Sequence, residues 1–338
     1  MQNIMLSKLL SELFFFLLFL CSLCSLCSLC LCGENVFKVF LFMNESGPFF
    51  EKHLTVCKSN QTILDCLSEN CPQISKQTLK LAMKYGAVWI TPQYCKDQPR
   101  NDQSQNNLSS KTARIRRAKK ILQTGDQVHL YYNEAILFSE IKSAKLVSDE
   151  GEYSIWNKPC GMFSQGGKWG DHTSITRWVE LFGLGLNQLE QRPCFLVHRL
   201  DRATRGIILV AHSKQVANQF SKLFEQRKIY KQYRAIVAGQ YPNETSFQIL
   251  MDDIDHKKAK TKILSIDYDK ELNRSMLTLT IETGRKHQIR KHLAGVDFPV
   301  IGDRFHGVGK DTEIDLQLVA SQLSFVCPLT SEQRCYSI

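Results

Sequence analysis

Apolar residues at helical spacing predict two short helices near the start of the folded part of the chain. The first lies within residues 61–71, where residues three and four apart share one apolar face. The second would begin after Ser75, whose hydroxyl suits an N-cap. Short apolar runs over residues 87–90 and 127–132 then predict strands. Together these elements indicate a compact α/β module over residues 51–140.

The pattern becomes richer in strands after this module. Residues 207–211 are almost continuously apolar, which is typical of a strand buried on both faces. Residues 276–283 alternate between apolar and polar side chains, as a half-buried strand does. Ser213 would cap a helix between the two strands. Because strands and helices interleave without a strict βαβ rhythm, we expect an α+β domain over residues 152–330, in which helices flank a mixed β-sheet.

Composition agrees with two folded domains and indicates the kind of partner. The chain has 338 residues, of which 43% are hydrophobic, and this suits about two domains with real cores. Residues 141–151 would link the two domains. The formal net charge of +10 points to an anionic partner, with nucleic acid favoured over anionic lipid.

The first 42 residues form a separate apolar segment of low complexity. Residues 13–32 carry no charge and are mostly apolar, so they are long enough to cross a bilayer as a helix. The triplet Cys-Ser-Leu occurs three times in succession within them. Three interpretations stay open: an upstream extension of a protein that begins at Met43, a membrane anchor, or a signal segment. We expect a cytoplasmic protein, which would associate with membranes only if residues 13–32 are expressed.

The cysteines do not indicate a metal or redox site. Five of the thirteen fall within the low-complexity segment, and the other eight are scattered along the chain. None of those eight forms a Cys-x-x-Cys pair of the kind that zinc ribbons and thioredoxin-like sites use. We therefore expect buried free thiols in a reducing compartment.

A run of basic residues precedes the last predicted strand of the module. It holds six bases in ten residues without an acid: Lys111, Arg114, Arg116, Arg117, Lys119 and Lys120. Clustered bases displace counterions from an RNA backbone and give affinity without base specificity. A solvated charged loop is the alternative that this cluster alone leaves open. The order of helix, Ser-Lys helix, Gly-Ala-Val strand, basic stretch and Gly-Asp strand resembles the alpha-L RNA-binding module, named after a small-subunit ribosomal protein.

The segment His198-Arg199-Leu200-Asp201 is the first candidate for chemistry in the second domain. If a strand continues through it, Arg199 and Asp201 point to the same side. A neighbouring arginine favours the charged form of a carboxyl group, so Asp201 would be ionised at neutral pH. An ionised carboxylate at the lip of a sheet suits nucleophilic or base catalysis. A structural Arg–Asp pair at a turn is the alternative.

Two further segments carry cations and an aromatic ring. Residues 283–290 would end a strand and open a helix whose N-terminus suits a phosphate or carboxylate, with Lys286 and Arg290 on one helical face. An ordinary amphipathic helix is the alternative there. Period two places Lys231 and Tyr233 on one face of a strand, where the ring could stack on a nucleobase or simply pack in the core.

Taken in order, these three segments resemble the RluA family of RNA pseudouridine synthases. The matching motifs are His198-Arg199-Leu200-Asp201-x-x-Thr204-x-Gly206, Lys231-x-Tyr233 and Thr283-Gly284-Arg285-x-His287-Gln288-Ile289-Arg290. Supporting matches are Asn157-Lys158-Pro159 and Pro299-Val300-Ile301-Gly302-Asp303. Three positions depart from the usual pattern: Arg205 stands where the family has serine, His306 where tyrosine is common, and Cys327 where histidine is frequent.

The resemblance implies a role for each matched residue. Asp201 would be the catalytic aspartate, Tyr233 would pack on the target base, and Arg290 would pair with the catalytic carboxylate. Arg199 would help to hold the target nucleotide out of its helix, and Lys231 and Arg285 would complete the substrate-binding set.

The resemblance also implies the reaction and the partner. Uridine in structured RNA would be isomerised to pseudouridine, without a cofactor or a metal. An alpha-L module before the catalytic domain favours large-subunit ribosomal RNA as the substrate, with transfer RNA as the second choice. Two other classes stay open: a non-catalytic RNA-binding or assembly protein, and a membrane-anchored protein. We expect a monomer.

Overall fold

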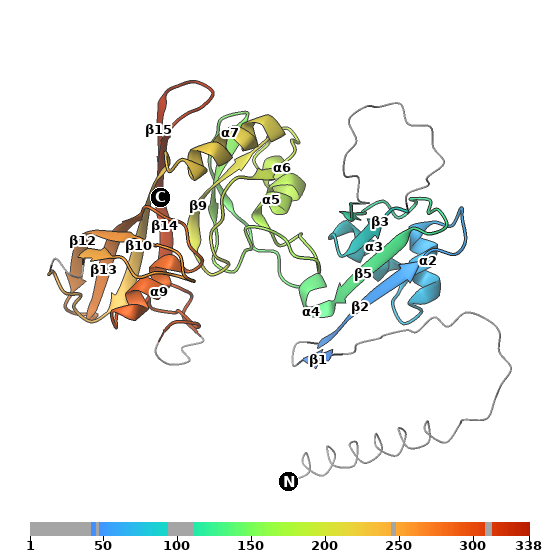
Figure 1. Ribbon diagram of the computed structural model, residues 1–338, viewed down its shortest axis with the longest axis horizontal. Helices are drawn as coiled ribbons and strands as arrows, with labels where there is room; N and C mark the ends of the chain where they lie inside the picture. Colours follow the sequence, from blue (N-terminus) through green and yellow to red (C-terminus); the bar gives the residue numbers. More distant parts are fainter. Residues whose placement is uncertain (1–41, 45–46, 94–110, 245–247, 308–312) are drawn as a thin grey trace, which may run out of the picture. The chain divides into compact units, whose positions relative to one another are not determined.

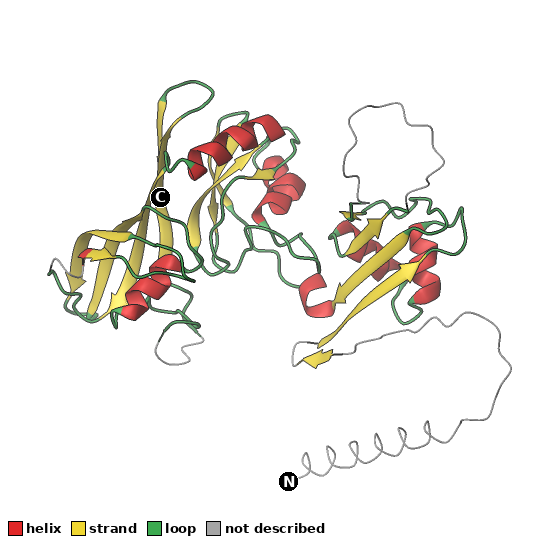
Figure 2. Ribbon diagram, in the orientation of Figure 1, coloured by secondary structure: helices red, strands yellow, loops and turns green. Residues whose placement is uncertain are grey.

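The computed structural model of the protein describes residues 42–44, 47–93, 111–244, 248–307 and 313–338. These residues form a five-stranded sheet with its own helices, followed by a larger ten-stranded sheet (Figures 1 and 2). The predicted apolar span over residues 13–32 lies outside the described residues. Within the described residues, no helix has both the length and the apolar character needed to cross a bilayer.

The five-stranded sheet and two helices make up the first module. Its strand order is β1-β2-β5-β3-β4, with antiparallel pairing throughout. The strands are β1 (Phe42–Asn44), β2 (Gly47–Thr55), β3 (Val88–Thr91), β4 (Ala113–Arg114) and β5 (Gln127–Asn133). The helices are α2 (Ile63–Asn70) and α3 (Lys76–Lys84), and a single turn, α4 (Glu134–Leu137), follows β5. Ser75 caps α3 as predicted, because its hydroxyl accepts a hydrogen bond from the Thr78 N–H.

The ten-stranded sheet forms the second domain. Its strand order is β11-β12-β13-β10-β14-β9-β7-β6, and β8 and β15 pair with β9 and β14. Strands β6 to β10 are β6 (Lys145–Asp149), β7 (Tyr153–Lys158), β8 (Phe195–Leu196), β9 (Arg205–Ala211) and β10 (Tyr230–Ala238). The others are β11 (Ile249–Leu250), β12 (Thr261–Asp269), β13 (Arg274–Ile281), β14 (Leu318–Val326) and β15 (Gln333–Ser337). Strands β9 and β14 run parallel, whereas the other described pairs are antiparallel, so the predicted mixed sheet is confirmed.

Strand β9 lies at the centre of this domain and is buried on both faces, as its apolar run predicted. Ile208 and Val210 belong to one apolar core, and Ile207 and Leu209 belong to the core on the other face. Helix α7 (Lys214–Glu225) packs on the second of these cores, and its predicted N-cap, Ser213, accepts from the Val216 N–H. The remaining helical segments cover the first core: α5 (Ile175–Trp178), η1 (Val179–Gly183), α6 (Leu184–Leu186) and α9 (Gln288–Gly295).

The expected limits of the second domain differ from the observed sheet. Residues 141–151 were expected to be a linker, but they contain β6, which pairs with β7 at the edge of the large sheet. Five residues with a charged residue at each end give a weak strand signal, and pairing with β7 decides the conformation. At the other end, β15 pairs with β14 beyond residue 330.

The close approach of β9 and β14 predicts a large effect of a single methyl group. Gly206 has φ of +122°, and a Cβ atom there would lie 2.3 Å from the Ala320 carbonyl oxygen. We expect Gly206→Ala to lower the free energy of unfolding by about 2 kcal/mol or more. Gly295→Ala is the control, since it meets nothing within 4 Å. Equal denaturant midpoints for the two variants would contradict this prediction.

Candidate active site

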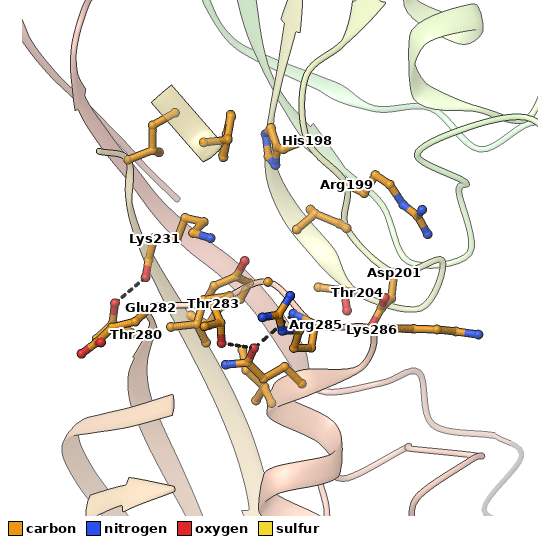
Figure 3. A pocket seen from close by; sticks show the side chains of 18 of the residues that line it. His198, Arg199, Asp201, Thr204, Lys231, Thr280, Glu282, Thr283, Arg285 and Lys286 are labelled. Carbon is orange, nitrogen blue, oxygen red and sulfur yellow. Dashed lines mark hydrogen bonds between the residues drawn. The ribbon is translucent and has the colours of Figure 1, made fainter. Parts of the chain in front are cut away.

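A cavity of about 1270 Å³ brings together all six predicted catalytic and substrate-binding residues of the second domain (Figure 3). They are Asp201, Arg199, Lys231, Tyr233, Arg285 and Arg290. They come from the loop after β8, from the first half of β10, from the segment that joins β13 to α9, and from the first turn of α9 itself. Residues more than 80 positions apart in the sequence therefore line one cavity.

Asp201 lies on a loop, so no continuous strand sets the directions of Arg199 and Asp201. The strand β8 ends at Leu196, and residues 197–204 have no regular structure. Buried partners fix the loop instead. The Ser164 hydroxyl accepts from the Leu200 N–H at 2.9 Å and donates to the Leu200 carbonyl at 2.6 Å. The Gly161 N–H donates to the Arg202 carbonyl, so both neighbours of Asp201 are held.

Lys158 also holds the loop that carries Asp201. Its side chain is fully buried, and its ammonium donates to the carbonyls of Met162 at 2.9 Å and of Arg202 at 3.4 Å. Burial lowers the pKa of Lys158 to about 7, and the charge of Asp201 opposes part of that shift. The sequence motif that contains Lys158 was recognised, but its support of the Asp201 loop was not predicted.

The burial of Lys158 predicts a stability difference that depends on pH. Its pKa is about 7 in the folded chain, against an ordinary value near 10.4, so the native state loses its proton first as the pH rises. The cost of burying the charge is therefore complete below about pH 7 and is relieved between about pH 7 and 10. Lys158→Met lacks this cost, so its stability relative to the wild type should fall as the pH rises. Urea unfolding near pH 6.5 and near pH 9.5 measures the difference, and a constant offset would contradict the prediction.

Arg290 is held mainly by a residue that the sequence did not reveal as a partner. Arg290 is 2% exposed, and its guanidinium makes a bidentate contact with the Asp303 carboxylate, at 2.7 and 2.6 Å. Its third nitrogen, Nη1, lies 3.6 Å from Asp201 Oδ2, which is the predicted pairing. Burial opposes both charges, but the two hydrogen bonds raise the pKa of Arg290 and lower that of Asp303.

Two histidines complete the surroundings of Asp201. His287 Nε2 lies 4.0 Å from Asp201 Oδ1, and His287 Nδ1 lies 2.9 Å from His306 Nε2. His287 has φ of +55°, a left-handed conformation, and α9 begins only after it, at Gln288. Lys286 therefore precedes the helix, and the prediction that Lys286 and Arg290 share a helical face was wrong. Burial lowers the pKa of both imidazoles, which favours their neutral forms.

Strand β10 supplies the aromatic wall of the cavity. Tyr233 is 8% exposed, and its neighbour two residues back, Lys231, is half-buried beside it. Burial, and then the charge of Asp201, raises the pKa of Tyr233, so its phenol stays protonated. A β-bulge between Gln232 and Tyr233 interrupts the register with β14 at this point.

The remaining residues of the first and third motifs have different environments. Arg199 is exposed at the rim of the cavity, where Figure 3 shows its side chain. The guanidinium of Arg285 donates to the Lys258 carbonyl at 3.1 Å. His198 is stacked on Phe224, and its Nε2 accepts from the Leu209 N–H at 3.0 Å. Burial lowers the pKa of His198 to about 3, which favours the neutral imidazole that accepts this hydrogen bond.

The predicted RNA-binding cluster of the first module divides into two groups. Arg114 and Arg116 both face Asp171, at 3.5 and 2.5 Å, and both also donate to backbone carbonyls. Arg114 in addition stacks over Trp89. The other four members are exposed: Lys111, Arg117, Lys119 and Lys120. These four are the members of the cluster that stay available to an RNA backbone.

This division predicts separate effects on RNA binding and on stability. The triple variant Arg117→Ala/Lys119→Ala/Lys120→Ala should weaken RNA binding and reduce its salt slope by about two to three units. Its unfolding temperature should stay close to that of the wild type, because exposed charges contribute little to stability. Arg116→Ala should instead lower the unfolding temperature, since it removes a contact of a mostly buried Asp171. Filter binding over a salt series and thermal unfolding measure both, and an unchanged salt slope would identify a solvated loop.

The second domain is similar to one group of known proteins in sequence and in structure. The family described as RNA pseudouridylate synthase matches residues 152–295. The dual-specificity RNA pseudouridine synthase RluA of Haemophilus influenzae is 29% identical over 208 residues, which cover 57% of this chain and 91% of that protein. The tRNA pseudouridine synthase C of Vibrio parahaemolyticus is 31% identical over 169 residues, which cover 41% and 69%. The solved structure of human RNA Pseudouridylate Synthase Domain Containing 4 is 22% identical, with a TM-score of 0.46, and covers 57% of this chain and 87% of that one.

Proposed function

The chain belongs to the RluA family of RNA pseudouridine synthases, and from this premise we propose that it modifies uridine in large-subunit ribosomal RNA, with Asp201 as its catalytic residue. The class of reaction is that of the family, an isomerisation within RNA. The N1–C1′ bond of the uridine breaks, the uracil turns in the pocket, and C5 bonds to C1′. The C5 proton is then lost to solvent and N1 takes up a proton, so that the product is an isomer of the substrate. Our proposal concerns the choice of RNA and the roles of the cavity residues.

The single observation that carries the proposal is the environment of Asp201. Its carboxylate is the acidic group that faces the buried guanidinium of Arg290 from the cavity side, at 3.6 Å. A carboxylate in this position can act as a nucleophile or a base. About a quarter of the Asp201 side chain stays exposed, so a substrate atom can reach it.

The other residues of the cavity suit a base that has been turned out of its helix. Removing a base from its stack costs a few kcal/mol, and contacts with the flipped nucleotide offset this cost. The ring of Tyr233 offers an apolar face to the uracil, while its protonated phenol can donate a hydrogen bond. The exposed Arg199 at the rim can contact the RNA backbone or fill the space that the base leaves.

The first module is what favours ribosomal RNA as the target. A separate basic module adds contacts to an extended RNA surface beyond the target uridine, which suits a large folded RNA. Transfer RNA is the second candidate, because relatives of this chain carry the names tRNA pseudouridine synthase C and dual-specificity RNA pseudouridine synthase. A non-catalytic binding protein would not need a carboxylate placed against a buried arginine.

Pseudouridine mapping tests both the reaction and the target. Stable RNAs from a strain that lacks the gene would be mapped, and the mapping repeated after the gene is restored as wild type or as Asp201→Asn. We expect one or a few large-subunit sites to disappear and to return only with the wild type. Sites that change only in transfer RNA would overturn the proposed target, and no change in any RNA would overturn the proposed function.

A further inference from the structure

The cavity is larger than one nucleotide requires. Pockets that enclose a single drug-sized ligand have about 300–1,000 Å³, and the volume here is about 1270 Å³. The extra wall follows β10 away from Tyr233 toward its first residue, Tyr230, and then into the turn that joins α7 to β10. At about 3.3 Å per residue, Tyr230 lies about 10 Å along the strand from Tyr233. Figure 3 shows Lys231 and Asp201 on opposite sides of the cavity.

This distal wall carries like charges close together. Arg227 and Lys228 are exposed at the turn, and both line the cavity together with Lys231. Burial, and then the charge of Arg227, lowers the pKa of Lys231. None of the three takes part in an ion pair between described residues. The cavity also has two exposed acids: Glu282, which pairs with Lys260 at 2.6 Å, and Glu225, the last residue of α7.

The backbone of the turn places an arginine where glycine is the usual residue. The Arg227 N–H donates to the Phe224 carbonyl, and the Lys228 N–H donates to the Leu223 carbonyl. These two bonds form a Schellman motif at the end of α7, and its left-handed position is usually glycine. Arg227 occupies that position with φ of +56°. A charged side chain at a position that favours glycine indicates a use for the side chain beyond closing the helix.

The first residue of β10, Tyr230, is 42% exposed beside these cations. Its hydroxyl donates to Gln232 Oε1 at 3.4 Å, so its ring shares the Gln232 face of the strand and not the face of Lys231 and Tyr233. Proteins that hold single-stranded RNA combine a cationic groove, which follows the backbone, with aromatic rings on which bases stack. The cavity has both components, because Arg227, Lys228 and Lys231 supply the cations and Tyr233 supplies the ring.

We propose that the α7–β10 turn is a second RNA subsite, in which Arg227 and Lys228 bind phosphates of the nucleotides that flank the target uridine. This inference rests on the RNA pseudouridine synthase function of the same cavity. It sets the path of the RNA strand, which would run from Asp201 along β10 to the end of α7. It also implies that recognition extends over several nucleotides of unpaired RNA.

The length of the RNA separates this subsite from the catalytic end of the cavity. The full chain would be titrated with fluorescent oligouridylates of about 3 and about 12 nucleotides, and binding followed by anisotropy. In Arg227→Gly/Lys228→Ala, glycine suits the left-handed position, so the fold should be kept. We expect the Kd of the longer RNA to rise about tenfold and its salt slope to fall by about 1.4, because each phosphate contact contributes about 0.7. The Kd of the shorter RNA should rise less than about threefold.

Matched variants assign the effect to this turn. Lys214→Ala/Lys222→Ala removes two exposed lysines from α7 that do not line the cavity, and it should leave both affinities within about twofold of the wild type. Thermal unfolding of each variant checks the fold.

Three results would overturn the subsite. They are equal losses on both RNA lengths, no loss on either, or an equal loss in the Lys214/Lys222 control. The function itself is tested separately, by tritium release from RNA labelled at C5 of uridine with the wild-type chain. If that release fails, the family activity is absent here, whatever the binding data show.

Discussion

Asp201→Asn is expected to abolish turnover and to leave both the fold and RNA binding intact. The amide keeps the size of the side chain but removes the charge on which nucleophilic or base catalysis depends. The fold should survive because Arg290 keeps its two hydrogen bonds to Asp303, at 2.7 and 2.6 Å, when Asp201 loses its charge. The Asp201 side chain is itself partly exposed, so the neutral amide is not stranded in the core.

Single-turnover tritium release from RNA labelled at C5 of uridine measures this prediction. We expect a loss of at least about 1,000-fold, which corresponds to about 4 kcal/mol of transition-state stabilisation. The control is Asp267→Asn, an exposed carboxylate on β12 outside the cavity, which should keep full activity. Near-normal turnover in Asp201→Asn, in a preparation free of wild-type enzyme, would refute a catalytic role for this carboxylate.

Local signals in the sequence were sufficient to predict the framework that carries the site. The structure confirms three signals that depend on neighbouring residues alone. They are the period-two alternation, the continuous apolar run before residue 212, and the N-caps Ser75 and Ser213. The three motifs also gathered the correct residues around one cavity, because the resemblance carries long-range information that periodicity lacks.

The local backbone around the catalytic loop could not be predicted, because distant residues determine it. The loop at Asp201 is fixed by Lys158 and Ser164, which lie about 40 residues earlier. The late start of α9 follows from Gln288, which is buried and whose Oε1 accepts from the Arg285 N–H and the Thr283 hydroxyl. These hydrogen bonds set the left-handed residue before the helix, and helical spacing alone gives no sign of them.

The same limit applies to charged residues whose partners are far away in the sequence. Arg290 was predicted to pair with Asp201, but Asp303 holds it more closely. Arg114 and Arg116 read as free cations within a basic run, yet both face Asp171, more than 50 residues later. A sequence shows the charge of a residue, whereas the tertiary fold decides which charges stay available for a ligand.

Arg290→Met is expected to lose both activity and stability, in contrast to Asp201→Asn. Removing the guanidinium leaves the Asp303 carboxylate, whose side chain is fully buried, without its charged partner. Breaking a buried pair in this way costs about 3–5 kcal/mol. Turnover should also fall, because the Asp201 carboxylate loses the guanidinium that lies 3.6 Å from it and helps to orient it.

The pH dependence of this loss identifies Asp303 as its cause. In the wild type the pKa of Asp303 is lowered, so the pair contributes stability at neutral pH that is lost as the pH falls through that pKa. In Arg290→Met, burial without a partner should raise the pKa of Asp303, so acid protonates the carboxyl and relieves the cost. The stability difference between wild type and variant should therefore shrink between about pH 7 and pH 4. A difference that stays constant would assign the loss to packing.

A double variant separates the fold from the chemistry. Arg290→Met/Asp303→Asn removes both charges of the pair, while the amide oxygen can still accept from the backbone N–H groups of Phe305 and His306. Replacing both members of a buried ion pair by neutral groups is often close to neutral for stability. We expect the double variant to regain most of the unfolding free energy that Arg290→Met loses, and to stay inactive in tritium release. If activity returned together with stability, Arg290 would serve only the fold, and catalysis by Asp201 would not need the Arg290 charge.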